Sequence, residues 1–137
     1  MTKEFIPYEQ ALELKELGFD EPCIKFYWTD GIFLKDYEKP FNYNKRDNVI
    51  SAPLYQQAFR WFREKFNLKS SIMDFIDDVT GIEWDYSIAI IGTDIDEKGE
   101  YVPLIDYSID DPNRKYGTYE KSELACLIKL IEICKNK

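Results

Sequence analysis

The densest group of residues that could do chemistry is a run of carboxylates between positions 74 and 100. Closely spaced carboxylates can act as a general acid and base, or they can hold a divalent cation. Solvated turns and the outer faces of strands carry the same residue types, and we favour this second interpretation. The run consists of Asp74, Asp77, Asp78, Glu83, Asp85, Asp94, Asp96, Glu97 and Glu100.

Within this run, the spacing of Asp94, Asp96 and Gly99 is similar to the start of a calcium-binding loop. The fifth position of such a loop is Lys98 here, and the twelfth is Ile105, where a bidentate glutamate is needed. A hairpin turn explains the spacing better than a metal site does. We therefore expect no metal and no cofactor.

The residues that the sequence lacks argue against several enzyme classes as the function of this protein. It contains no histidine, so a Ser-His-Asp or Cys-His arrangement cannot form, and it has no phosphate-binding loop or dinucleotide fingerprint. Cys23, Cys126 and Cys134 are odd in number and far apart, which predicts reduced thiols in a core and disfavours a structural zinc site. We predict a protein that is not an enzyme.

Charge is segregated along the chain. The net charge is −8, and residues 70–113 hold twelve acidic residues and one basic residue. Nucleic acid is disfavoured as a partner, because an acidic surface repels phosphates. A protein partner with a basic surface fits better than nucleic acid, and Asp94, Asp96 and Glu97 are predicted as contacts. The alternative, which we favour, is that these acids only keep the protein soluble.

Gln56, Arg60 and Arg63 form one basic edge of a predicted helix, with Lys45 and Arg46 shortly before it. Arginine binds anions through two parallel hydrogen bonds, so this edge could dock to an acidic protein or to phosphate. Pairing with the acidic segment of the same chain is the alternative, and we favour it.

Residues 51–68 are predicted to form the central helix. At about 100° per residue, its apolar side chains fall within an arc of roughly 160°. Ser51 is predicted to cap the helix, and Pro53 suits its first turn. Each large side chain contributes roughly 1.5–3 kcal/mol when buried, so this face should lie on the core. The apolar set is Leu54, Tyr55, Ala58, Phe59, Trp61, Phe62 and Phe66.

A first helix is predicted over residues 7–17. Gly18 can adopt the left-handed conformation that ends it. Phe19 would then pack back on Leu14, as in a Schellman ending.

A β-hairpin is predicted next, from residues 23–28 and 32–37, because Asp30-Gly31 suits a tight turn. The predicted register places Tyr27 opposite Leu34. It also places Lys25 opposite Asp36 as an ion pair.

Three further runs are predicted as strands, and residues 38–50 as a long surface loop. Residues 71–76 are apolar, and we favour a strand there over a helical turn. Residues 82–92 alternate between apolar and polar side chains. Residues 101–109 contain Pro103, which cannot donate to a ladder and predicts an edge strand.

Residues 119–135 are predicted to form the last helix, with Thr118 as its cap. Its apolar residues cover two adjacent faces. Such a helix packs on two sides within its domain, or a second subunit covers it, so a homodimer through the C-terminal helix is one expectation. The sequence has no apolar run near 18 residues and no signal-peptide pattern, which predicts a cytoplasmic protein without membrane contact.

Three segments resemble a family of small uncharacterised proteins that phages and prophages of gut bacteria encode. They are EFIPYEQALELKELGFDEPC, SAPLYQQAFRWFREKFNL and YGTYEKSELACLIKLIEICK. Family members have similar helices in the same order, but the last helix usually begins with an acidic-alanine pattern where this chain has Lys121-Ser122. The resemblance implies a phage or mobile-element origin. It implies no activity and no catalytic residues.

Together these patterns predict one α+β domain over residues 1–137. Its antiparallel sheet would have about four to five strands and three helices in the order α-β-β-α-β-β(-β)-α. The predicted function is that of a phage or mobile-element accessory protein that binds a host or phage protein in the host cytoplasm. A small metal-dependent enzyme that uses acidic residues is one alternative. A self-assembling structural protein is another.

Overall fold

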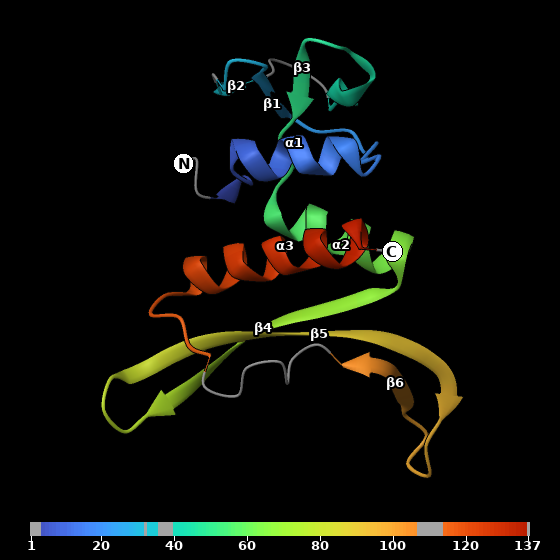
Figure 1. Cartoon of the computed structure of the whole chain (residues 1–137), viewed down its shortest axis with the longest axis vertical. Helices are drawn as coiled ribbons and strands as arrows, with labels where there is room; N and C mark the ends of the chain where they lie inside the picture. The colour runs from blue at the N-terminus through green and yellow to red at the C-terminus, as the bar shows by residue number, and fades with distance from the viewer. Residues whose placement is uncertain (1–3, 32, 36–39, 107–113, 137) are drawn as a thin grey trace. The chain divides into compact units, whose positions relative to one another are not determined.

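The structure is a computed structural model that describes residues 4–31, 33–35, 40–106 and 114–136. Their Cα positions form two compact units, unit 1 (residues 1–58 and 131–137) and unit 2 (residues 59–130). The strands form two antiparallel sheets of three strands, β2-β1-β3 in unit 1 and β4-β5-β6 in unit 2 (Figure 1). In chain order the elements are α1 (Tyr8–Glu16), β1 (Lys25–Trp28), β2 (Phe33–Lys35), the 3-10 helix η2 (Tyr43–Lys45), β3 (Val49–Ser51), α2 (Tyr55–Phe66), β4 (Leu68–Asp77), β5 (Gly81–Ile95), β6 (Tyr101–Asp106) and α3 (Tyr119–Lys135).

The predicted α+β class with three helices and antiparallel strands is confirmed within the described residues. The predicted single sheet is wrong, because the strands divide between two sheets. In the first sheet β1 is central and is flanked by β2 and β3, which are three residues long each. The single domain over residues 1–137 stays a prediction.

The end of α1 follows the predicted Schellman geometry. Gly18 has a φ of +95°, in the left-handed region. The Phe19 amide donates to the Leu14 carbonyl at 2.9 Å, and the Gly18 amide donates to the Lys15 carbonyl at 3.1 Å. Phe19 and Leu14 are both buried, so the turn brings two core side chains of unit 1 to its end.

The β1–β2 hairpin forms where expected, but the predicted register is wrong by one residue. Tyr27 lies opposite Phe33, and Lys25 lies opposite Lys35. The reason is the turn. The Gly31 amide donates to the Trp28 carbonyl at 2.9 Å, and Gly31 has a φ of +90°, so the connection is not the two-residue turn that was expected. The predicted partner of Lys25, Asp36, lies outside the described residues.

Residues 38–50 were predicted as a loop, but their described part, residues 40–50, contains η2 and begins β3. Asn44 links this segment to its surroundings in unit 1: its side chain donates to the Phe19 carbonyl at 2.9 Å and accepts from the Ser51 amide at 2.9 Å. Tyr43 is buried beside Phe26, with the ring centroids 4.5 Å apart. The predicted cap at Ser51 is wrong, since Ser51 belongs to β3 and α2 begins four residues later.

The predicted core face of the central helix is largely confirmed. Within unit 2, Trp61 and Phe62 are buried and their rings contact each other and Phe66 at centroid distances of 5.2–5.9 Å. In unit 1, Tyr55 and Ala58 of the same helix are buried as well. Leu54, which precedes the helix, is exposed.

The unit 2 sheet is built on β5, which is fifteen residues long. The strand β4 pairs with its first part in one continuous register from Leu68 opposite Ile90 to Asp77 opposite Gly81. The strand β6 pairs with its last part, with two register shifts (Figure 1). The strands predicted over residues 71–76 and 82–92 are thus confirmed, and so is the strand predicted over 101–109 as far as residue 106, since residues 107–109 lie outside the described residues. Among the described strands, β6 with Pro103 is an edge strand as expected.

The helix α3 begins as predicted, because the Thr118 hydroxyl accepts from the Lys121 amide at 3.2 Å. Its apolar side chains are mostly buried within the single chain, and Ile128 is an exposed exception. The buried set is Cys126, Leu127, Leu130, Ile131, Ile133 and Cys134. These side chains therefore need no second subunit to cover them, and a homodimer through this helix stays a prediction.

All three cysteines are free and buried, as predicted. Burial raises the pKa of the Cys23 and Cys126 thiols to about 12, so both stay protonated at neutral pH. None of the described helices has the length and apolar character needed to span a bilayer.

Candidate functional site

The turn between β4 and β5 is fixed by one carboxylate. Asp77 Oδ1 accepts from the amides of Val79 and Thr80 at 2.8 and 3.1 Å, and Oδ2 accepts from Lys115 Nζ at 3.1 Å. The two amides, together with Lys115, lower the pKa of Asp77 to about 2. Gly81 completes the turn with a φ of +89°. The geometry of this turn is therefore set by its own polar groups.

Three aliphatic side chains are strongly exposed at this turn. Ile76 is 82% exposed, Val79 is 90% exposed and Ile82 is 63% exposed. Ile76 and Ile82 are directly opposite each other in the ladder, so both side chains lie on one face of the hairpin. We call Ile76, Val79 and Ile82 the tip cluster. A group of neighbouring exposed aliphatic side chains at a loop tip is typical of a surface that contacts another molecule.

Acidic side chains surround the tip cluster. Asp74 and Asp78 are exposed, and Asp77, next to Ile76 in β4, accepts from the Val79 and Thr80 amides. A partner that covers this surface would need an apolar contact area with basic groups at its rim. Two of the nine acids singled out from the sequence thus flank an apolar surface that the sequence pattern did not reveal.

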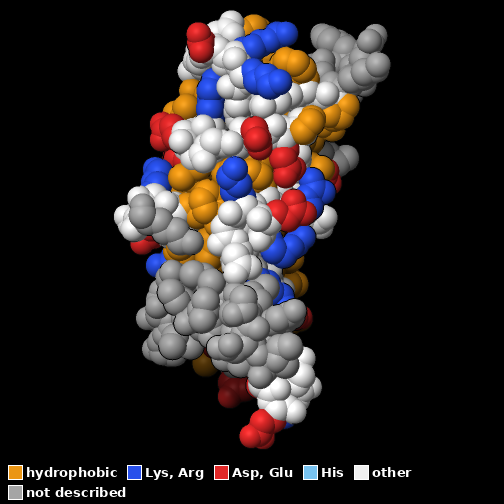
Figure 2. Space-filling model, turned by 90° about the vertical axis from the view of Figure 1, so that its right-hand side faces the viewer, with side chains coloured by type: hydrophobic (Ala, Val, Ile, Leu, Met, Phe, Trp, Pro, Cys, Tyr) orange, Lys and Arg blue, Asp and Glu red, His pale blue; other side chains and the backbone are white. Residues whose placement is uncertain are grey.

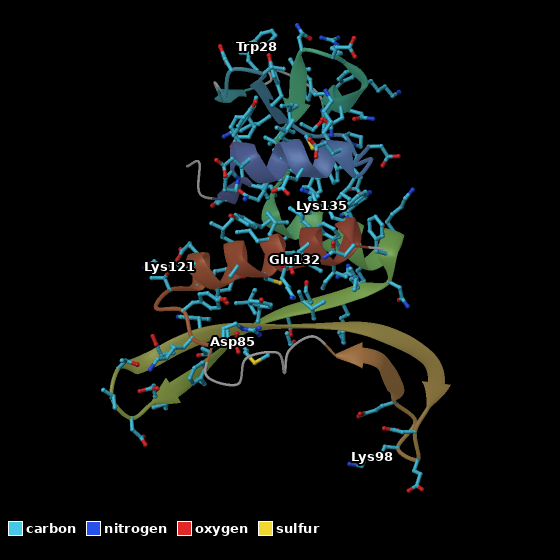
Figure 3. The ribbon with its side chains drawn as sticks, viewed as in Figure 1. Trp28, Asp85, Lys98, Lys121, Glu132 and Lys135 are labelled. Carbon is cyan, nitrogen blue, oxygen red and sulfur yellow. The ribbon has the colours of Figure 1, made fainter. Side chains whose placement is uncertain are left out.

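The second acidic turn, between β5 and β6, holds the predicted contacts. Asp96 Oδ1 accepts from the amides of Lys98 and Glu100 at 2.9 and 3.0 Å, so this carboxylate is used by the turn itself. Glu97 is exposed. The side chain of Asp94 lies outside the described residues. In Figure 2 acidic side chains mark this turn at the lower end of the view, and Figure 3 labels Lys98 there.

These hydrogen bonds bear on the resemblance to a calcium loop. Asp96 Oδ1 accepts from two amides of the turn, and β5 and β6 pair on either side of it, with Ile95 opposite Tyr101. A hairpin turn thus forms at this spacing as predicted, and the absence of a bound metal stays a prediction. Across the described residues, no group of three or more Cys, Asp or Glu side chains is placed to hold a metal ion. The alternative of a metal-dependent enzyme gains no site from this part of the chain.

An arginine that the sequence analysis did not single out anchors the first part of β5. Arg114 Nε donates to Asp85 Oδ1 at 2.7 Å, and Arg114 Nη2 donates to the Tyr86 carbonyl at 2.7 Å. Its guanidinium lies 3.9 Å from the centroid of the Tyr86 ring, and its side chain is 9% exposed. Figure 3 labels Asp85 on β5. Part of the acidic run is thus neutralised within unit 2 by an arginine, whereas the second interpretation of that run expected its carboxylates to be solvated.

Next to this pair, Tyr116 forms an antiparallel bridge with Trp84 of β5, in the part of β5 that β6 does not pair with. The amides of Trp84 and Tyr116 each donate to the carbonyl of the other residue at 2.8 Å. The Tyr86 and Tyr116 rings are stacked with centroids 6.1 Å apart, and burial raises the pKa of Tyr86 to about 12. This end of β5 is therefore held on both sides.

The basic edge predicted on the central helix lies on α2. Gln56, Arg60 and Arg63 are all exposed. Arg60 has an electrostatic or hydrogen-bonding interaction of its own, so it is not a free anion-binding group. In unit 1, Lys45 is exposed, and the Arg46 guanidinium lies 5.0 Å from the centroid of the Phe41 ring. The proposed docking role of this edge stays a prediction.

No protein-family model, curated protein or solved structure matches this chain. The resemblance to phage and prophage proteins therefore stays a prediction. Within unit 2, the tip cluster is the surface feature that points most directly to binding of another molecule.

Proposed function

We propose that this protein is a non-enzymatic binding module of a phage or mobile element that binds a host or phage protein through the β4–β5 tip. The observation that supports this proposal is the tip cluster. Ile76, Val79 and Ile82 expose more than half of their surface at a turn whose backbone is fixed by Asp77. A rigid apolar tip loses little conformational entropy when a partner covers it.

Burial of the tip cluster would supply part of the free energy of specific binding. Burial of one large aliphatic side chain contributes roughly 1.5–3 kcal/mol, so the three together could contribute roughly 4–7 kcal/mol before the costs of association. Other contacts around the tip would add to this contribution. The cluster would then act as the centre of an interface, and the surrounding acids as its rim.

The charges around the tip indicate the chemistry of the partner. Asp74 and Asp78 are exposed beside the cluster, and residues 70–113 carry a large excess of acidic groups. Complementary charge speeds encounter and selects partners more than it raises affinity. A basic protein surface fits best, including one that normally contacts nucleic acid phosphates.

The test compares two serine variants in affinity capture from host lysate. The double variant Val79→Ser/Ile82→Ser removes most of the tip cluster and leaves the Asp77 turn bonds in place. The control, Ile24→Ser, removes an aliphatic residue that is 48% exposed in unit 1. We expect recovery of the captured protein to fall at least about tenfold with the double variant, and to stay unchanged with the control.

The acidic rim is tested with the purified partner. Glu97→Lys reverses a charge that no turn bond uses, whereas Asp78→Lys reverses a charge beside the tip. We expect Asp78→Lys to slow association and to reduce its dependence on salt more than Glu97→Lys does. Equal capture by the wild-type protein and the tip variant would refute a docking role for the tip.

A further inference from the structure

The strand β4 has a free edge. It pairs with β5 on one side, and within the described part of unit 2 no strand pairs with its other side. The free edge is ten residues long, from Leu68 to Asp77, with no proline and no register shift. Natural sheets usually protect such an edge, because its unpaired amides and carbonyls can pair with another chain. The opposite edge, β6, carries Pro103 and two register shifts.

The contacts of Trp84 show which groups of β4 face the free edge. Trp84 exchanges both backbone hydrogen bonds with Tyr116, so its amide and carbonyl point away from β4. Asp74, which lies opposite Trp84, is therefore in a pair without ladder bonds, and its own amide and carbonyl point to the free edge. Because these directions alternate from one residue to the next along a strand, the amides and carbonyls of Ser70, Ile72 and Ile76 also point to the free edge.

We infer that the free edge of β4 pairs with the same edge of a second copy of this chain, antiparallel, about a twofold axis at Met73. Such an axis stands normal to the joined sheet, so each residue pairs with a residue of the same face and the interface is self-complementary. In this register Ile72 exchanges backbone bonds with Asp74 of the second copy. Ser70 exchanges them with Ile76 of the second copy.

Charge selects this register. Lys69 of each copy lies opposite Asp77 of the other, which gives two symmetric ion pairs at the ends of the interface. Both residues fall in pairs without ladder bonds, where side chains of facing strands lie closest. Asp77 Oδ2 accepts one bond, from Lys115, and a carboxylate oxygen can accept a second.

The neighbouring registers are less favourable. If the twofold axis moves by one residue toward the β4–β5 turn, from Met73 to Asp74, then Asp74 lies opposite Asp74 of the second copy. This register brings like charges together. If the axis moves by one residue in the opposite direction, from Met73 to Ile72, then Lys69 lies opposite Phe75 of the second copy. The charge of Lys69 is then without a partner across the interface. Neither alternative register pairs Lys69 with an acid.

The side chains between the ion pairs suit an intermolecular contact. Met73 is 42% exposed and would lie against Met73 of the second copy, while Phe75 is 38% exposed and would lie against Ser71. Methionine adapts its shape readily, so a self-contact at the axis is well tolerated. Pairing would cover apolar surface that a single chain leaves in water.

Asp74→Pro tests the backbone pairing. Proline removes an amide that points to the free edge and keeps the ladder between β4 and β5, because Asp74 makes no ladder bond. The matched control, Asp74→Ala, removes the same carboxylate and keeps the amide. With light scattering or sedimentation over a concentration series, we expect a dimer for the wild type and for Asp74→Ala. We expect dimerisation to weaken about 50-fold or more for Asp74→Pro, with unchanged circular dichroism.

Lys69→Glu tests the charge pairing without a change to the backbone. It would place a glutamate opposite Asp77 of the second copy, and we expect about tenfold weaker dimerisation. Lys65→Glu on α2 makes the same change in net charge away from this edge and should leave the dimer intact. This comparison decides the matter if Asp74→Pro does not fold.

A wild-type protein that stays monomeric up to about 500 µM would overturn the inference, and so would a dimer that neither Asp74→Pro nor Lys69→Glu weakens. The inference does not depend on the proposed function. Val79→Ser/Ile82→Ser should lose the captured partner and keep the dimer, whereas Lys69→Glu should lose the dimer and keep the partner.

Discussion

Replacing Glu123 with glutamine is expected to stabilise the protein at neutral pH and to leave it unchanged in mild acid. Glu123 lies in α3 and is 8% exposed. Burial raises the pKa of its carboxyl to about 7, Glu120 adds to the rise by repulsion, and a hydrogen bond from Tyr119 opposes it. At pH 8 the folded protein therefore holds a buried charge that glutamine would remove.

The direction of the pH dependence follows from this raised pKa. Between the ordinary value of 4.5 and about 7, the folded state binds a proton that the unfolded state has released. The contribution of this carboxyl to stability is therefore highest below about pH 4.5, falls as the pH rises to about 7 and stays low above it. The full shift corresponds to about 3 kcal/mol, and a discount for solvent screening reduces this to about 2 kcal/mol.

Urea unfolding at several pH values measures this effect. The difference in free energy of unfolding between Glu123→Gln and the wild type should be near zero at pH 4.5 and about 2 kcal/mol at pH 8. For a urea slope of about 2 kcal/mol/M, this moves the midpoint by about 1 M. Taking the difference cancels the other titrating groups. Glu64→Gln, at an exposed position of α2, serves as the control and should give a difference that does not change with pH.

A difference for Glu123→Gln that stays constant from pH 4.5 to pH 8 would refute the reasoning. It would mean that the carboxyl titrates alike in the folded and unfolded chains. A variant less stable than the wild type at pH 8 would also refute it, because the charged form would then be the favoured one.

Two further predictions concern stability. Gly18→Ala forces a side chain into a φ of +95° and should cost about 1 kcal/mol in the urea-derived free energy of unfolding, whereas Gly117→Ala, outside that region, should cost much less. Equal losses for both would contradict this assignment. Arg114→Met leaves the Asp85 carboxylate without its partner and should cost about 2–3 kcal/mol, while Lys115→Met at an exposed position should cost less than about 1 kcal/mol. A much smaller loss for Arg114→Met, no larger than that for Lys115→Met, would show that water solvates Asp85.

Much of the secondary structure could be predicted from the sequence, because its causes are local. The ending of α1 depends on the left-handed conformation of Gly18, and the start of α3 depends on the Thr118 hydroxyl. The alternation of residues 82–92 predicted β5, and Pro103 predicted an edge strand. In each case one residue or a short period decides the outcome, and distant parts of the chain do not compete with it.

The errors in the prediction arise where two local solutions have similar energies. The turn around Asp30 and Gly31 can close the hairpin in more than one register, and the register that forms places Tyr27 opposite Phe33. Ser51 can cap a helix or lie in a strand, and pairing with Phe26 places it in β3. Here a long-range backbone ladder outweighs a single cap, which contributes about 1 kcal/mol.

The sequence by itself determined the helices, most strands and the reduced core thiols, since propensity, periodicity and burial depend mainly on residue type. Only the tertiary structure decided that the strands divide between two sheets, that Arg114 pairs with Asp85, and that Ile76 and Ile82 meet at an exposed turn. The physical reason is that the ion pair and the division into sheets join residues far apart in the chain, whereas the exposure of Ile76 and Ile82 depends on which parts of unit 2 cover the hairpin. No local pattern carries the free energy of those contacts, so the surfaces that support the proposed function appear only in the folded chain.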